Sequence, residues 1–271
     1  MSDLRADCAA CMGLCCVAPG FARSADFAID KPAGTPCPNL SADDSCSIHA
    51  VLRPRGFSGC TTYDCFGAGQ QVTRHTYAGA ATWRSHPESA GEMFRVFAVM
   101  RALHELLFYL DEALRLTRPG ALHDRLNLAA ADTDRLTRTS AAALDGFDVD
   151  ALRERVVPLL RAASERARGS AVGRRTPQLP RDLVGHDLRG ADLRGADLRG
   201  ALLVGADLRG ALMQLADLTG TDLRAADVRG TDLGSTLFLS QLQVNASRGD
   251  ERTALPAGLE RPPHWPRATP A

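Results

Sequence analysis

The feature that most constrains this chain is a strict five-residue period that begins near Arg181 and continues to about residue 245. The pentads read HDLRG, ADLRG, ADLRG, ALLVG, ADLRG, ALMQL, ADLTG, TDLRA, ADVRG and TDLGS. The central residue is nearly always Leu, and the residue two positions earlier is nearly always Ala or Thr. A short period of this kind is typical of repeat architectures, in which each unit is buried only by its neighbours. Residues 181–250 are therefore predicted to form a separate repeat domain.

This pattern resembles the pentapeptide-repeat family. The resemblance implies a right-handed, four-sided β-helix with four pentads per turn, in which the central Leu and the small residue point inward. A narrow coil has room for one large and one small side chain on each side, and its backbone groups can pair with the turns above and below. At an ordinary strand separation of ~4.8 Å, the pentads would make about three turns, which form a short rod of roughly 15 Å.

The charges of the repeats bear on one function known for this family, because some pentapeptide-repeat proteins mimic DNA and act on DNA gyrase. Duplex DNA carries one negative charge per ~1.7 Å, so a mimic needs a long acidic rod. Between Arg181 and Asp232 the chain has nine Asp and seven Arg, which nearly balance. Gyrase-directed mimicry is therefore kept only as an alternative, and the Asp and Arg side chains are expected to form surface pairs.

Several apolar side chains occupy pentad positions expected to face outward, and some of them must be covered. They are Leu202, Val204, Leu212, Leu215, Leu237, Leu239 and Leu242. We expect the tail, residues 251–271, to cap the open edge of the last coil with Trp265 as its anchor. The alternative is that these residues form a surface for a second copy of the chain or for another protein.

All eight cysteines lie in the first quarter of the chain. They are Cys8, Cys11, Cys15, Cys16, Cys37, Cys46, Cys60 and Cys65. Residues 1–70 have few apolar side chains and cannot build an ordinary core. In a reducing compartment, clustered cysteines are more often metal ligands than disulfides, and a C-x2-C pair lets two thiolates reach one ion from a tight turn. We therefore predict a metal-binding module, with all eight cysteines as candidate ligands.

The motifs PCPNL at 36–40, CSIH at 46–49, RP at 53–54 and GCTTYDC at 59–65 resemble the YkgJ-like cysteine-cluster family. This resemblance covers about residues 8–70 and implies chelation of zinc or iron. Eight thiols match two four-Cys zinc sites, or one iron–sulfur cluster with structural thiols left over. His49 could replace one thiol. Two other interpretations of the same cysteines stay open beside metal binding. One is a redox-active dithiol at Cys8 and Cys11, and the other is unliganded thiols or disulfides. Adjacent Cys15 and Cys16 are expected to point apart and not to share an ion.

Residues 71–168 are predicted to form a helical bundle that packs on the cysteine-rich module. Met93, Phe97 and Met100 begin an apolar face with helical spacing that ends before Pro119. Pro158 is expected to kink the last helix. His104 begins HELLF, which lacks the second histidine of a zinc-protease motif, so it is predicted to lie on a helix surface. Residues 169–180 contain Gly, Ser and Pro without periodicity and are predicted to be a linker.

Composition excludes some classes of protein. The 32 basic and 32 acidic side chains cancel, which argues against a basic nucleic-acid-binding surface. The most apolar run, residues 94–116, carries too many charges to span a bilayer, and no export signal is visible at the amino terminus. We therefore expect a cytoplasmic protein. Lys31 is the single lysine of the chain.

Together these patterns predict a multidomain α+β fold: a cysteine-rich metal-bound module, a helical bundle and a right-handed β-helix of pentapeptide repeats. The predicted function is metal binding, through zinc or an iron–sulfur cluster, with the repeats as an interaction or assembly surface. The expected partner is a protein, including a second copy of the chain, with no membrane and no direct nucleic-acid contact. An iron–sulfur enzyme of the methyl-transfer or redox type is the alternative, because the cysteine-cluster family resembles the metal-binding part of a flagellin lysine methylase. Catalytic activity is left open.

Overall fold

The computed structural model of this chain describes residues 4–79, 81–169 and 179–266. The chain divides into two compact units, Met1–Leu160 and Arg161–Ala271, and the boundary between them falls inside a helix. Nearly all of the predicted linker at 169–180 lies outside the described residues. The finer division into five parts stays a prediction.

The cysteine-rich part of the first unit contains only short helical segments. They are η1 (Cys8–Ala10), α1 (Leu14–Val17), η2 (His49–Val51), α2 (Ser58–Thr61), α3 (Ala68–Gln71) and the π-helical η3 (Val72–Thr76). Most of the chain between them is loop and turn, as expected for a segment rich in Gly, Pro, Ser and Asp. This part is therefore held by specific contacts more than by regular structure.

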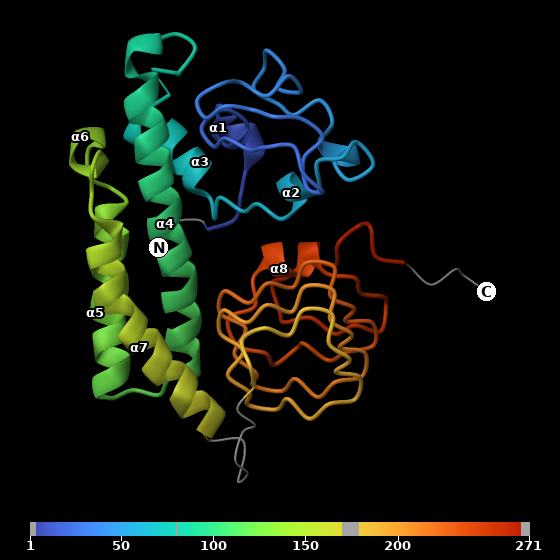
Figure 1. The fold of residues 1–271 in the computed structure, drawn as a ribbon. Helices are drawn as coiled ribbons and strands as arrows, with labels where there is room; N and C mark the ends of the chain where they lie inside the picture. The colour runs from blue at the N-terminus through green and yellow to red at the C-terminus, as the bar shows by residue number, and fades with distance from the viewer. Residues whose placement is uncertain (1–3, 80, 170–178, 267–271) are drawn as a thin grey trace. The chain divides into compact units, whose positions relative to one another are not determined.

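Three longer helices and two short helical segments follow among the described residues, and they supply much of the apolar surface of the unit. They are η4 (Pro87–Ser89), α4 (Ala90–Leu116), α5 (Ala121–Leu136), α6 (Ala141–Leu144) and α7 (Val149–Gly169). Helices α4 and α5 run side by side (Figure 1) and pack on each other. The predicted apolar face of α4 is buried, including Met93, Met100 and Leu107. Helix α7 continues through Pro158 as one element.

The second unit is built from the pentads, which we call the repeat coil, residues 182–237. Isolated parallel bridges join residues twenty positions apart, for example Asp187 to Asp207 and Asp207 to Asp227. Backbone hydrogen bonds such as Leu188 N–H to the Asp207 carbonyl (2.8 Å) link the same successive turns. Helix α8 (Gln241–Ala246) follows the last pentad.

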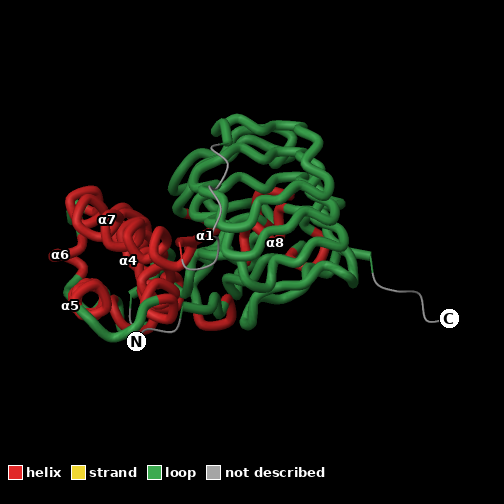
Figure 2. The backbone as a smooth tube through the Cα atoms, turned by 90° about the horizontal axis from the view of Figure 1, so that it is seen from below, coloured by secondary structure: helices red, strands yellow, loops and turns green. Residues whose placement is uncertain are grey.

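The predicted β-helix, and with it the α+β fold class, is wrong for the described residues. Helices are the only regular elements there, and Figure 2 shows the repeat coil as loop throughout, without a β-strand. Each pentad contributes one bridging residue and then turns, so no ladder of successive pairs can grow. Gly190 and Gly200 make such turns at φ 63° and 61°, a conformation that favours glycine. The repeats are a coil of turns and single bridges.

The interior of the repeat coil contains the predicted central and small residues. Leu198, Leu203 and Ala206 are completely buried. Two of the residues expected to face outward, Leu237 and Leu239, are also buried, so that expectation is wrong for them. Leu202 and Leu212 do face outward.

The described part of the tail folds back on the segment that follows α8. Trp265 is 2% exposed, and its indole N–H donates to the Ser247 carbonyl at 3.1 Å. Gly249 allows this close approach, because a Cβ at that position would lie 2.4 Å from the Trp265 ring. Arg261 donates to the Thr253 carbonyl at 3.0 Å. Trp265 therefore belongs to the buried cluster of the second unit.

Asp and Arg side chains pair within the pentads. In each of six pentads the Asp accepts both the backbone N–H and the guanidinium of the Arg two residues later, as Asp197 does from Arg199 at 3.2 and 2.9 Å. The other pairs begin at Asp187, Asp192, Asp207, Asp222 and Asp227. Arg189 and Arg209 also lie 3.7 Å from the Asp of the next turn. The coil surface is thus largely neutralised by local pairs.

These pairs predict how the repeat coil responds to acid. Hydrogen bonds from Arg199 lower the pKa of Asp197 from an ordinary 3.8 to about 2, against the opposing effect of its partial burial. Because the folded-state pKa is the lower one, the pair stabilises the coil above about pH 4, and this contribution is lost as the pH falls toward 2. We expect the free energy of unfolding of the second unit to be flat from pH 7 to 5 and to fall below pH 4. Denaturant titrations across this range check it, and Asp197→Asn should show a shallower fall.

Within the described ranges, none of the helices is long and apolar enough to cross a membrane.

Candidate metal centre

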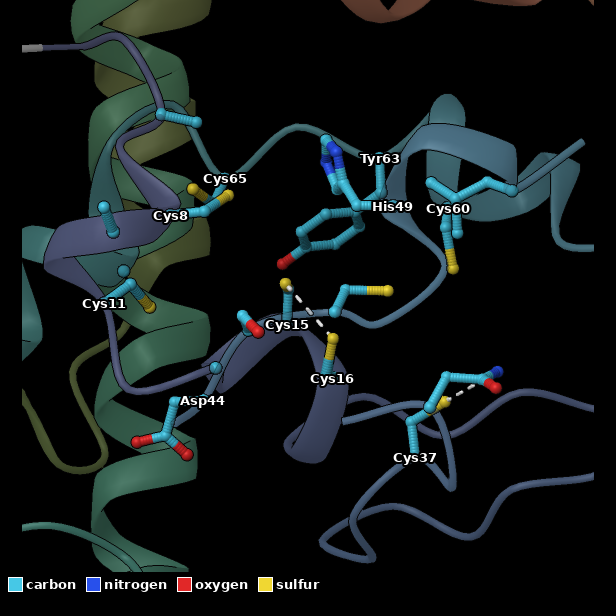
Figure 3. A pocket seen from close by; sticks show the side chains of 18 of the residues that line it. Cys8, Cys11, Cys15, Cys16, Cys37, Asp44, His49, Cys60, Tyr63 and Cys65 are labelled. Carbon is cyan, nitrogen blue, oxygen red and sulfur yellow. Dashed lines mark hydrogen bonds between the residues drawn. The ribbon is translucent and has the colours of Figure 1, made fainter. Parts of the chain in front are cut away.

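All eight predicted cysteines line a single cavity of about 570 Å³ in the first unit. Cys8 lies in η1, Cys15 and Cys16 lie in α1, and Cys60 lies in α2. The other four come from loops. Figure 3 labels the cysteines around the cavity apart from Cys46, together with His49 and Tyr63, and Cys46 also lines it. Positions separated by up to 57 residues in the sequence are thus brought to one place, and all eight thiols are free.

Two glycines shape the floor of this cavity. Gly13 begins α1 in the left-handed conformation (φ 70°), which turns the chain between Cys11 and Cys15. Gly69 in α3 leaves room for thiols, because a Cβ there would lie 2.6 Å from Cys11 Sγ and 4.0 Å from Cys65 Sγ. The three residues between Cys11 and Cys15 therefore form a tight turn.

A buried ammonium group joins the segments that carry Cys16 and Cys37. Lys31 is 3% exposed and donates to the carbonyls of Val17, Pro32 and Thr35 at 3.0, 3.3 and 2.9 Å. The Cys37 N–H donates to the Cys16 carbonyl at 3.0 Å beside it. Burial lowers the pKa of Lys31, and the neighbouring thiols, Cys37 first, oppose this shift. The single lysine of the chain is therefore a structural part of the cavity wall, a role that no sequence pattern indicated.

Helix α4 holds the segment that carries Cys65. Arg101 Nε donates to the Asp64 carbonyl at 2.9 Å, and its guanidinium lies over the Tyr63 ring, 5.3 Å from the centroid. His104 Nδ1 lies 2.6 Å from the Phe66 carbonyl, where the N–H tautomer donates. His104 is completely buried, so the prediction that it lies on a helix surface is wrong. Buried polar groups need partners, and here the partner is a loop carbonyl from a segment 38 residues away.

Cys15 and Cys16 also differ from expectation. Their Sγ atoms lie 4.0 Å apart and interact as a hydrogen-bonded pair (Figure 3), so they do not point apart. This contact lowers the pKa of Cys16 to about 7, assisted by Lys31, and raises that of Cys15. The α1 helix has only four residues, and the short turn lets both side chains reach the same cavity.

Four of the remaining thiols are held in the neutral form. Burial raises the pKa of Cys8, Cys11 and Cys46, and it raises that of Cys60 to about 12. The main cause is burial, because a thiolate in this cavity loses hydration, and the other thiols add to the shift. Lys31 opposes the shift at Cys60. A bound cation would reverse this balance, because metal ligation deprotonates thiols.

The donor set can be compared with what metals require. Eight thiols and one imidazole are soft and borderline ligands that suit zinc or an iron–sulfur cluster and do not suit magnesium or calcium. Yet across the described residues no three His, Cys, Asp or Glu side chains lie close enough to hold an ion as they stand. The ligand types therefore fit, while the sulfur atoms would have to move closer together by side-chain rotation. The role of the eight cysteines as ligands stays a prediction.

Comparisons with known proteins agree with the repeat pattern. The chain matches the family of pentapeptide repeats in eight copies, over residues 182–210 and 201–238. The chain thus contains pentapeptide repeats, and a separate cysteine-lined unit precedes them. It is 54% identical over 269 residues to "Uncharacterized protein YybG" of Bacillus subtilis (strain 168), a match that covers 97% of this chain and 95% of that one. The chain belongs to the same family as YybG. No solved structure matches it.

Proposed function

We propose that this protein binds metal through the thiolates of the eight-cysteine cavity and uses the repeat coil as a surface for assembly with a protein partner. The observation that carries the proposal is the gathering of all eight free thiols around one cavity. Structural cysteines that act as small apolar residues would be expected to disperse through a core, since each packs independently. Here they gather in a part of the chain whose helical segments are only three to five residues long.

The energetics of this part of the chain support the same proposal. The cysteine-rich segments have short helices and many loops, and their thiols repel one another when ionised. A bound ion supplies folding free energy to modules of this kind, because its ligands are dispersed in the unfolded chain. Persistent free thiols also suit a reducing compartment, and we propose the cytoplasm.

The repeat coil is proposed as the interaction surface because it leaves two large apolar side chains exposed among paired charges. Leu202 and Leu212 remain 44% and 40% exposed, while six of the Asp residues pair with the Arg two positions later. We do not extend the proposal to DNA mimicry, because paired Asp and Arg side chains lack the uncompensated negative charge of a duplex. A protein, including a second copy of the chain, is the proposed partner.

An iron–sulfur enzyme is the second candidate, and the size of the cavity favours keeping it. A volume of about 570 Å³ exceeds the need of a single four-coordinate ion, and Tyr63 and His49 place a hydroxyl and an imidazole on its wall. Such groups could serve a substrate or a cluster. The metal present in the protein separates this candidate from a structural zinc protein.

Metal content is the test of the proposal. We expect protein purified without oxygen and without an affinity metal to contain about two zinc ions per chain, or iron with acid-labile sulfide and visible absorption. After removal of metal by a chelator, Zn²⁺ should rebind and Mg²⁺ should not, because the donors are sulfur. Protein that contains no metal and takes up none after reduction would reject metal binding. Colourless zinc protein would reject the iron–sulfur enzyme.

A further inference from the structure

We infer that the eight thiols form two adjacent four-sulfur sites for divalent ions such as zinc, which meet at the Cys15–Cys16 pair. This inference rests on the proposed metal binding and adds which thiols share an ion. The first site contains Cys8, Cys11, Cys15 and Cys65. The second site contains Cys16, Cys37, Cys46 and Cys60.

The first site is gathered around α3. Cys11 Sγ and Cys65 Sγ both lie against Gly69, at 2.6 and 4.0 Å from the position a Cβ would take. The Cys11 N–H donates to the Cys8 carbonyl at 3.3 Å, and Figure 3 shows the Cys8 and Cys65 sulfurs pointing toward each other. Gln70 then ties the amino-terminal segment to α3 by hydrogen bonds with Asp7 N–H (2.8 Å) and the Arg5 carbonyl (2.7 Å).

The second site is gathered around the segment that follows α1. The Cys37 N–H donates to the Cys16 carbonyl, and an antiparallel bridge between Leu40 and Cys46 brings Cys46 back beside it. Asn39 Nδ2 donates to Cys37 Sγ at 3.7 Å, which is the kind of outer hydrogen bond that orients a ligand sulfur. In Figure 3, Cys16, Cys37 and Cys60 lie on the opposite side of Cys15 from Cys8 and Cys65.

A buried ammonium accompanies the second group. Lys31 Nζ donates to the Val17 carbonyl at 3.0 Å, next in the chain to Cys16, and to the Thr35 carbonyl at 2.9 Å, two residues before Cys37. Lys31 lies beside the second group, where four thiolates around one divalent ion would leave a net charge of about −2. The buried ammonium therefore offsets part of the charge on that side.

Cys15 and Cys16 form the boundary between the two sites. Their sulfurs are 4.0 Å apart, and each would bind its own ion at about 2.3 Å. The two ions would then lie within about 9 Å of each other, close enough for the occupancy of one site to affect the other. Adjacent cysteines in the sequence thus contribute to neighbouring sites.

The test compares variants of the two sites by metal content and by ¹¹³Cd NMR of the full-length protein. Wild-type protein should bind about two ions and show two cadmium resonances. Cys11→Ser should lose one ion and one resonance, and Cys60→Ser should lose one ion and the other resonance. Ser58→Ala, on the same short helix as Cys60, should keep both.

Gly69→Ala is a second variant of the first site that keeps all eight thiols. Its new Cβ must push Cys11 Sγ aside, and alanine is favoured in a helix, so we expect loss of the Cys11-dependent resonance with an unchanged thiol count. If either cysteine variant removed both ions, or broadened both resonances equally, the thiols would form one shared cluster and the division would be rejected. Wild-type protein without any bound metal would instead reject the proposed function itself.

Discussion

Lys31→Met should destabilise the cysteine-rich part of the first unit. The change removes a donor from three backbone carbonyls, those of Val17, Pro32 and Thr35, at a side chain that is 3% exposed. The Val17 and Pro32 carbonyls keep a backbone N–H, from Gly34 at 3.0 Å and from Thr35 at 3.3 Å, whereas the Thr35 carbonyl loses its donor, so the loss should be about 1–3 kcal/mol. The segments that carry Cys16 and Cys37 would then be held less firmly.

Amide hydrogen exchange, read peptide by peptide, measures this effect. We expect faster exchange over residues 14–40 in Lys31→Met and no change over residues 183–239, which belong to the other unit. Lys31→Arg is the matched control, because it keeps the charge but replaces a compact three-donor group with a planar fork. Lys31→Arg should give exchange rates over residues 14–40 that lie between those of the wild type and those of Lys31→Met. Exchange over 14–40 that stays at the wild-type rate in Lys31→Met would show that the ammonium does not hold these segments.

Leu203→Ala should cost the second unit about 2–5 kcal/mol, whereas Leu202→Ala should cost less than about 1 kcal/mol. Leu203 is completely buried in the repeat coil, and its removal leaves a cavity that a narrow coil cannot close. Leu202 is 44% exposed although it is the next residue in the chain. Because the two residues are neighbours in the chain, comparing the two variants separates the effect of side-chain burial from the effects of backbone position and of helix or strand propensity.

Denaturant unfolding followed by Trp265 fluorescence measures both variants. Trp265 is buried in the second unit, and a Trp83→Phe background removes the signal of the other tryptophan. Both variants should be compared in that background, so that the loss of the hydrogen bond from Trp83 to the Met12 carbonyl is common to them. Equal midpoints for the two variants would contradict the assignment of Leu203 to the interior.

The helical part of the first unit could be predicted from the sequence because its signals are local. The apolar spacing from Met93 to Leu110 and the break at Pro119 act through neighbouring turns of one helix, and α4 ends at Leu116 as this pattern requires. The prediction that places His104 on the surface of that helix is wrong. Its burial depends on the Phe66 carbonyl, which no local pattern indicates.

The cysteine-rich part shows the limit of spacing arguments. Count and composition indicate that these thiols act together, and the structure does place all eight around one cavity. The predicted separation of Cys15 from Cys16 is wrong, because the side-chain directions depend on how a four-residue helix begins at Gly13. The part played by Lys31 is also hidden in the sequence, since its three acceptors are defined only once the loops have closed.

For this protein, the sequence by itself determined the five-residue repeat, the inward positions of residues such as Leu198 and Ala206, and the separation of a cysteine-rich part from the repeats. These properties follow from the types of side chain and their spacing along the chain, which are local features of the sequence. Tertiary structure alone decided that the pentads pair through single bridges without forming strands, and which thiols lie next to one another. Both depend on backbone turns and on contacts between distant segments, whose free energies no single stretch of sequence contains.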